Sequence, residues 1–275
     1  MSRFAAFDEL SAMADMNDPH VETLYYRINH AKSVDFNKAP ALEHAESGFI
    51  VRIERDQATI TMKDHYDTAE SARAAVEPFL RAWELSCALY SATDKFEFSF
   101  QKSATIDRVP SPGILDAAIG VYVITGQDIS TTCNVSRSRY PEPPIGLACD
   151  AYVDFMLHRY RMYREGRTTL ADVSNYCLTV LELAAAEAGA EHDARKVTAQ
   201  RFGFALNVLG TLGRLSSTKG GIEARKGKAS RVEFTAEERV WLEAALQRII
   251  RRAAEVAYDP RAAEIEITMA NLPPI

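Results

Sequence analysis

The feature that most constrains the fold is a change of hydrophobic period near the middle of the chain. Before about residue 135, apolar residues recur at every second position over short stretches, as in Phe96, Phe98 and Phe100. After about residue 147, they recur three and four positions apart over long stretches. A period of two is typical of half-buried strands, and a period near 3.6 is typical of amphipathic helices. The sequence therefore predicts an α+β fold: an α+β module followed by an all-helical module.

The N-terminal half predicts an antiparallel sheet packed on one long helix. After a short helix at residues 2–15, strands are expected at residues 24–30, 49–53, 58–62, 96–100 and 121–124. The second and third strands alternate apolar and polar side chains around a short polar turn, which is typical of a β-hairpin. Thr68 can cap a long helix that covers the sheet, with a kink or a break at Pro78. The polar segment 31–47 is expected to be a loop.

The C-terminal half predicts four helices. They are expected at residues 147–165, 169–189, 193–213 and 235–257. The last helix opens with a capping box formed by Thr235 and Glu238, whose side chains can satisfy the first free backbone amides. Its apolar residues cover more than one face. Part of this helix is therefore expected to contact the N-terminal module or a second copy of the chain, and we favour a homodimer.

Composition divides the chain in the same place. We place the α+β module at residues 1–136, a linker with three prolines at 137–146, and the helical module at 147–275. Residues 1–144 hold 14 basic and 21 acidic residues, whereas residues 145–261 hold 18 and 15. The second half can thus present a local surface to an anionic partner although the whole chain has a net charge of −6.

Cysteine spacing and hydropathy predict the cellular location of the protein. None of the four cysteines forms a C-x-x-C pair, which favours a reducing environment over a disulfide framework. The first residues include acids where a signal peptide requires an apolar run. The longest uncharged helical stretch is far shorter than the roughly 20 residues of a membrane span. We expect a cytoplasmic protein without a membrane partner.

A basic loop between the third and fourth predicted helices is the first candidate site for an anion. Its glycines could let the backbone approach a phosphate, which lysine and arginine would neutralise. The candidate residues are Lys219, Arg225, Lys226, Lys228 and Arg231. The loop is not a nucleotide-binding P-loop, because Ala229 rather than Ser or Thr follows Gly227-Lys228. A solvated, exposed connector remains the alternative interpretation.

The end of the helix predicted at 147–165 is the second candidate nucleic-acid surface. Arg159, Arg161 and Arg164 lie among Tyr160 and Tyr163, and such a mixture can stack on bases and pair with phosphates. Cations near a helix C-terminus also have a structural cause, since they interact favourably with the helix dipole. Both interpretations stay open on the sequence alone.

Established catalytic and metal-binding motifs are absent from the sequence. Asp150, Asp154 and His158 are four residues apart and share one helix face, yet their spacing matches no established set of metal ligands. The sequence contains no H-E-x-x-H, G-x-S-x-G or G-x-G-x-x-G motif. We therefore predict no metal site and no cofactor.

Some segments resemble known families. Ala82-Trp83-Glu84-Leu85, followed by Phe96–Phe100 and Ile106-Asp107-Arg108, resembles a group of uncharacterised bacterial proteins. The helical half, with long helices on either side of Leu215-Ser216-Ser217 and Ala224-Arg225-Lys226, is similar in layout to HEPN-type helical domains of prokaryotic defence and toxin systems. Those domains often dimerise and bind RNA, and their nuclease members carry an Arg a few residues before a His. Neither histidine of the helical half has such an Arg, so the resemblance implies a non-catalytic relative.

These observations lead to one main hypothesis and two alternatives. The main hypothesis is a non-enzymatic interaction or structural protein that is homo-oligomeric through its helical half. The first alternative is an RNA- or DNA-binding, or nuclease-related, protein of a bacterial defence system that uses the basic loop. The second alternative is a small-molecule enzyme with a pocket between the two modules.

Overall fold

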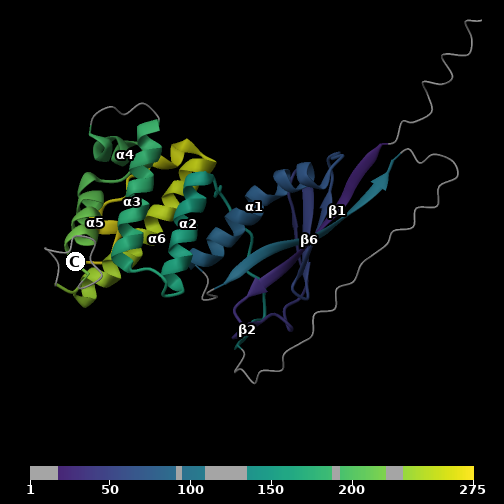
Figure 1. The fold of residues 1–275 in the computed structure, drawn as a ribbon, viewed down its shortest axis with the longest axis horizontal. Coiled ribbons are helices and arrows are strands. Elements are labelled where there is room, and N and C mark those ends of the chain that lie inside the picture. The colour runs from purple at the N-terminus through teal and green to yellow at the C-terminus, as the bar shows by residue number, and fades with distance from the viewer. Residues whose placement is uncertain (1–17, 91–94, 109–134, 188–192, 221–231) are drawn as a thin grey trace, which may run out of the picture. The chain divides into compact units, whose positions relative to one another are not determined.

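The computed structural model describes residues 18–90, 95–108, 135–187, 193–220 and 232–275 (Figure 1). The helix expected at 2–15 and the strand expected at 121–124 lie outside these residues. The described elements confirm the α+β class. The chain divides into two compact units. We call Met1–Glu77 with Lys95–Tyr140 the sheet unit, and Pro78–Asp94 with Pro141–Ile275 the helical unit.

The sheet unit is built on a five-stranded antiparallel sheet with the order β3-β4-β5-β1-β6. Its strands are β1 (Pro19–His30), β3 (Leu42–Ala45), β4 (Phe49–Glu54), β5 (Gln57–Met62) and β6 (Phe96–Asp107). The predicted hairpin is confirmed as β4–β5. Arg55 and Asp56, at its tip, have φ values of 50° and 58°, and two consecutive left-handed residues are the conformation that tight hairpin turns require.

Alternation along the strands creates one buried face of this sheet. Phe96 and Phe98 of β6 are 3% and 8% exposed, as predicted for that strand. Phe100 is only half-buried, and its ring contacts Tyr26 of β1 and the guanidinium of Arg73. The sequence therefore identified the buried face of β6 but not the position at which burial fades along the strand.

The prediction of a loop at 31–47 is wrong in part. Leu42–Ala45 forms the edge strand β3, which pairs antiparallel with residues 50–53 of β4. In addition, β2 (Val34–Asp35) pairs in parallel with β7 (Val135–Ser136). Most side chains of these short strands are partly or fully exposed, so backbone hydrogen bonding defines the strands and no hydrophobic alternation reveals them.

The long helix predicted after Thr68 is α1 (Ala69–Tyr90). The Thr68 hydroxyl accepts a hydrogen bond from the backbone N–H of Ser71 at 3.2 Å, which confirms the predicted cap. Helical structure continues through Pro78, so the expected break is absent there. The division between the two units nevertheless falls between Glu77 and Pro78, inside this helix.

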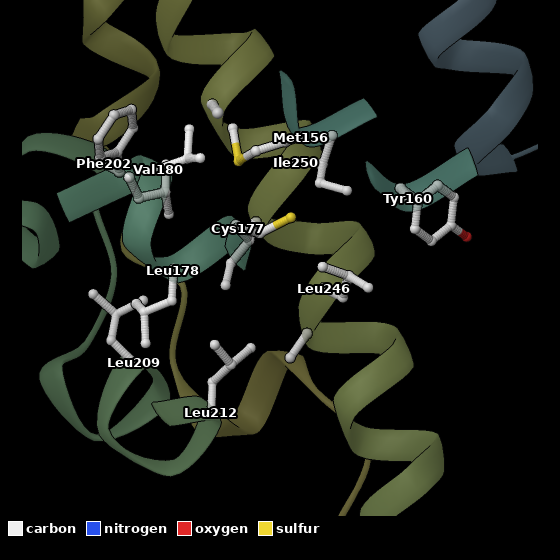
Figure 2. Close-up of a cluster of buried hydrophobic side chains, with 14 of the residues drawn as sticks. Met156, Tyr160, Cys177, Leu178, Val180, Phe202, Leu209, Leu212, Leu246 and Ile250 are labelled. Carbon is white, nitrogen blue, oxygen red and sulfur yellow. The ribbon is translucent and has the colours of Figure 1, made fainter. Parts of the chain in front are cut away.

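The helices of the helical unit lie side by side (Figure 1) and pack around one hydrophobic core. Its elements are α2 (Ala151–Arg164), α3 (Leu170–Glu187), α4 (Ala194–Phe202), α5 (Leu206–Thr218), α6 (Ala236–Tyr258) and the 3-10 helices η2 (Pro260–Glu264) and η3 (Met269–Asn271). Figure 2 shows side chains such as Met156, Cys177 and Ile250 meeting in this core. The apolar residues of α6 are fully buried within it: Trp241, Leu242, Leu246, Ile249 and Ile250. The helical unit itself thus covers the surface that we expected to meet another module or copy.

The third predicted helix is two helices, which corrects the prediction of one helix at 193–213. Gly203 separates α4 from α5 and has a φ of 62°. A Cβ atom at this position would collide with the backbone carbonyl of Ala263. The turn also brings Phe204 into a parallel β-bridge with Ile267. Gly203 therefore ends α4 as a left-handed C-cap, in which the backbone N–H of Phe204 bonds the carbonyl oxygen of Ala199 at 2.8 Å. The glycine is a local helix-end signal that the prediction of one helix overlooked.

Capping hydrogen bonds confirm two further predicted helix starts, whereas the helix expected from residue 147 begins only at Ala151, after its cap Asp150. Thr235 and Glu238 form the capping box of α6. Thr169 caps α3 by accepting from the backbone N–H of Asp172 at 3.1 Å. Among the helices that the structure describes, none is long and apolar enough to cross a membrane.

Candidate functional site

Lys219 is the one residue of the predicted basic-loop site that the structure describes. Its Nζ bonds both carboxylate oxygens of Glu238 at 2.7 Å, and the two side chains are 22% and 13% exposed. This hydrogen bond is the main reason that the pKa of Glu238 is lowered. Lys219 thus joins the end of α5 to the start of α6. The other candidates, Arg225, Lys226, Lys228 and Arg231, lie outside the described residues.

The three arginines of α2 do not form one surface. An α-helix turns by about 100° per residue, so residue 159 points away from residues 161 and 164, which are three positions apart and neighbours on the helix. Arg161 bonds Glu84 of α1 at 3.1 Å, and the guanidinium of Arg159 lies 5.4 Å from the ring centre of Tyr176 of α3. Arg164 donates to the hydroxyl of Tyr160 at 3.4 Å. The predicted arginine surface is therefore divided among three neighbours within the helical unit.

Arg161 belongs to a buried ionic cluster. The Glu84 carboxylate is 1% exposed and also accepts a hydrogen bond from Arg81 at 2.7 Å. Burial, followed by the charge of Glu84, raises the pKa of the Cys87 thiol to about 12. Burial also raises the pKa of Cys149 to about 12. Both cysteines are thus protonated near neutral pH and lack the thiolate that nucleophilic chemistry requires.

The residues considered as metal ligands have structural positions. The Asp150 carboxylate caps α2 by accepting from the backbone N–H of Val153 at 2.8 Å. Asp154 and His158 are exposed on the same helix. Within the described residues, no three His, Cys, Asp or Glu side chains are grouped so that they could hold a metal ion.

One candidate site is a groove of about 670 Å³ between α3 and α5, which we call the α3–α5 groove. One face of each helix lines it, with residues spaced three and four apart, and the start of α4 closes it. The lining consists of Asn175, Leu178, Thr179, Glu182, Arg195, Gly210, Gly213, Arg214 and Ser217. Hydroxyl, amide and charged groups dominate this set, so the groove suits a polar ligand.

Two glycines of α5 shape the α3–α5 groove. No atom lies within 4 Å of an ideal Cβ on Gly210, so this residue leaves open space in the groove. A Cβ on Gly213 would lie 2.6 Å from Nη1 of Arg195. The absent side chain therefore admits the Arg195 guanidinium, which bonds Glu182 at 2.8 Å. Neither residue needs glycine for its own backbone conformation, since both lie within a regular helix.

Arg214 provides the surplus charge of the α3–α5 groove. Two guanidinium groups and one carboxylate line it, and Glu182 already pairs with Arg195. In the part of the chain that the structure describes, the exposed guanidinium of Arg214 forms no hydrogen bond or ion pair. Its charge is near enough to contribute, after Lys219, to the lowered pKa of Glu238. Arg214 can therefore bind an anionic group.

A second pocket, of about 430 Å³, lies between the end of α2 and the middle of α6. We call it the α2–α6 pocket, and its lining residues are Tyr160, Tyr163, Arg164, Gly166, Glu243 and Gln247. The Tyr163 hydroxyl donates to Oε1 of Glu243, and the Tyr160 hydroxyl accepts from Nε2 of Gln247 at 3.0 Å. Burial, and next the bond to Glu243, raises the pKa of Tyr163. The hydroxyl groups of both tyrosines therefore take part in hydrogen bonds within this pocket.

Sequence reasoning found Arg164 and the two tyrosines of the α2–α6 pocket but not their partners on α6. It missed the α3–α5 groove, for which two glycines inside a helix were the available signal. No protein-family model, no curated protein and no solved structure matches the chain. The resemblance to HEPN-type domains therefore stays a prediction.

Proposed function

We propose that the protein is a non-enzymatic interaction protein whose helical unit binds a carboxylate-bearing segment of a protein partner in the α3–α5 groove. The observation that supports this most directly is the position of Arg214. Its guanidinium lies in a groove of about 670 Å³ and forms no hydrogen bond or ion pair with the described residues. A carboxylate can form two parallel hydrogen bonds with such a guanidinium.

The shape of the groove favours a polypeptide. Gly210 leaves space above the backbone of α5, so another main chain could approach closely. Asn175, Thr179 and Ser217 offer amide and hydroxyl groups along the groove, which can pair with peptide N–H and C=O groups. Nucleic acids require several neutralised phosphates, whereas this described lining has one unpaired cation.

The chemistry of the groove favours binding over catalysis. Its described lining includes no histidine or cysteine. The Ser217 hydroxyl donates to the backbone oxygen of Gly213 at 2.7 Å rather than to a general base. A serine nucleophile needs an adjacent base to accept its proton. The groove is thus equipped to hold a ligand and not to attack it.

Homo-oligomerisation fits the same proposal, because a second copy of the chain could provide the carboxylate-bearing segment.

The alternative function, binding of RNA or DNA, draws support from the position of the basic residues. Arg214 and Lys219 precede the segment that contains Arg225, Lys226 and Lys228, so further cations lie close in sequence. The two functions differ in their dependence on salt and in the ligand that is held.

Fluorescence anisotropy with the full chain tests the proposal. Labelled peptides containing Asp and Glu should bind, and peptides with Asn and Gln in their place should bind at least about tenfold more weakly. Arg214→Gln should cause the same loss, while Arg248→Gln, which removes one charge from α6, should not. Failure of every acidic peptide, together with salt-sensitive binding of single-stranded RNA or DNA, would replace this proposal by the nucleic-acid alternative.

A further inference from the structure

We propose that the α2–α6 pocket binds a neutral, planar ring that carries a carbonyl oxygen beside a ring N–H, as in a uracil-type heterocycle. The pocket has a volume of about 430 Å³, within the roughly 300–1,000 Å³ range of small-molecule sites. It is a different site from the α3–α5 groove, and the inference does not depend on the function proposed for that groove.

Tyr160 supplies a hydrogen-bond donor for the carbonyl oxygen. This residue is 2% exposed, and Figure 2 shows its hydroxyl pointing away from the neighbouring aliphatic side chains. The hydroxyl oxygen accepts from Gln247 at 3.0 Å and from Arg164 at 3.4 Å. Its own hydrogen has no acceptor among the described residues. Buried polar groups are normally satisfied, so a ligand oxygen would complete this arrangement.

Glu243 supplies the acceptor for the ring N–H. Its Oε1 accepts the hydrogen of the Tyr163 hydroxyl, which fixes the orientation of the carboxylate. Its Oε2 has no hydrogen-bond partner in the part of the chain that the structure describes. Glu243 and Gln247 lie one helical turn apart on the same face of α6. An acceptor and donors are thus adjacent, which matches a ring edge with N–H next to C=O.

Charge and aromatic character narrow the ligand further. Arg164 and Glu243 are the charged residues of the lining and have opposite signs, so the pocket favours a neutral ligand over an anion. The half-buried ring of Tyr163 adds an aromatic wall, with its centre 6.3 Å from that of Tyr160. A flat heterocycle can stack on such a wall, whereas a puckered ring loses part of that contact.

The uracil-type ring could belong to either of two ligands, a free nucleoside or a base in a single-stranded nucleic acid. Calorimetric titration of the full chain should compare uridine with single-stranded oligouridine. Tighter, salt-sensitive binding of oligouridine would identify nucleic acid as the source, because its phosphates release counterions. Equal affinity for the two probes would identify the free heterocycle as the ligand.

Two uridine derivatives test the assigned hydrogen bonds and stacking. Compared with uridine, 3-methyluridine lacks the ring N–H, and 5,6-dihydrouridine lacks the planar ring. Each should bind at least about tenfold more weakly. Equal binding of uridine and 3-methyluridine would overturn the role of Glu243, and undetectable binding of both uridine and oligouridine would overturn the proposal.

Matched variants assign the effect to residues. Tyr160→Phe removes the donor, and Glu243→Gln places an amide where the acceptor should be, so each should lower uridine affinity at least about tenfold. Tyr258→Phe makes the same chemical change at a tyrosine of α6 that is 64% exposed, and it should bind uridine as the parent does. Thermal unfolding followed by circular dichroism identifies a variant that has lost its fold. Unchanged affinity in a folded Glu243→Gln variant would contradict the assignment.

Discussion

Arg161 of α2 donates a hydrogen bond to Glu84 of α1 at 3.1 Å, and this carboxylate is 1% exposed. A buried carboxylate is stable only when charged or polar partners replace its water. Arg81 supplies another partner, at 2.7 Å. An arginine that the sequence presents as a nucleic-acid contact therefore holds two helices of the helical unit together.

Replacing Arg161 should destabilise the fold. Arg161→Leu removes one of the cations that pair with the buried Glu84, so unfolding free energy should fall by about 1–3 kcal/mol. Arg167→Leu is the control, because Arg167 is 56% exposed and pairs with the exposed Glu165. Its effect should stay within about 0.5 kcal/mol. Urea unfolding measures both free energies, and equal effects would show that the buried pair contributes no more to stability than the exposed pair.

Gly210→Ala should stabilise the protein and weaken partner binding. Alanine favours a helix interior by about 1 kcal/mol over glycine, and no atom obstructs the added methyl group. That methyl group would narrow the α3–α5 groove. Gly213→Ala provides the contrast, since its methyl group would displace Arg195 from Glu182. Thermal unfolding and peptide anisotropy give the two readouts, and a destabilised Gly210→Ala variant would contradict the expectation.

Protonation of His20 should make the sheet unit less stable in mild acid. Its ring stacks on that of His65, with centres 5.3 Å apart, and accepts a hydrogen bond from the backbone N–H of Tyr66. Burial, followed by the charges of Arg108 and His65, lowers the pKa of His20 below its usual 6.5. The unfolded chain therefore binds this proton more readily than the folded chain. This contribution to stability is complete above pH 6.5 and is lost as the pH falls from 6.5 through the folded-state pKa.

Urea unfolding between about pH 5 and pH 8 checks this dependence. The free energy of unfolding should rise with pH across this window, and His20→Phe should flatten the rise because phenylalanine cannot bind a proton. His158→Gln changes an exposed histidine of α2 and should preserve the parent profile. A slope that survives His20→Phe unchanged would assign the effect to other groups.

Leu246→Ala should destabilise the helical unit by about 2–5 kcal/mol, because Leu246 is fully buried in the core of its own unit.

The unfolding midpoint of the parent should not change between dilute and concentrated protein if the apolar surface of α6 is buried within one chain. Unfolding scans at several concentrations measure this directly. A midpoint that rises with concentration would show that a second copy contributes to stability.

Local signals in the sequence predicted local structure well. The capping box at Thr235 and the hairpin of β4 and β5 depend on residues a few positions apart, and both are confirmed. The strand β3 and the turn at Gly203 depend instead on distant backbone, namely β4 and the carbonyl of Ala263. No side-chain period in their own segments reports those contacts, although the glycine at 203 is itself a local signal for a helix end.

The same distinction applies to the candidate sites. The sequence by itself determined the α+β class, the capped starts of α1, α3 and α6, and the cationic character of the second half, because periodicity, capping and charge are properties of neighbouring residues. Only the tertiary structure decided that Arg161 pairs with Glu84, that Arg214 forms no hydrogen bond or ion pair with the described residues, and that Tyr160 meets Gln247. Helices remote in the chain must pack before their side chains can pair. The neighbours that packing brings to a charged residue therefore decide whether it stabilises the fold or is left to bind a ligand.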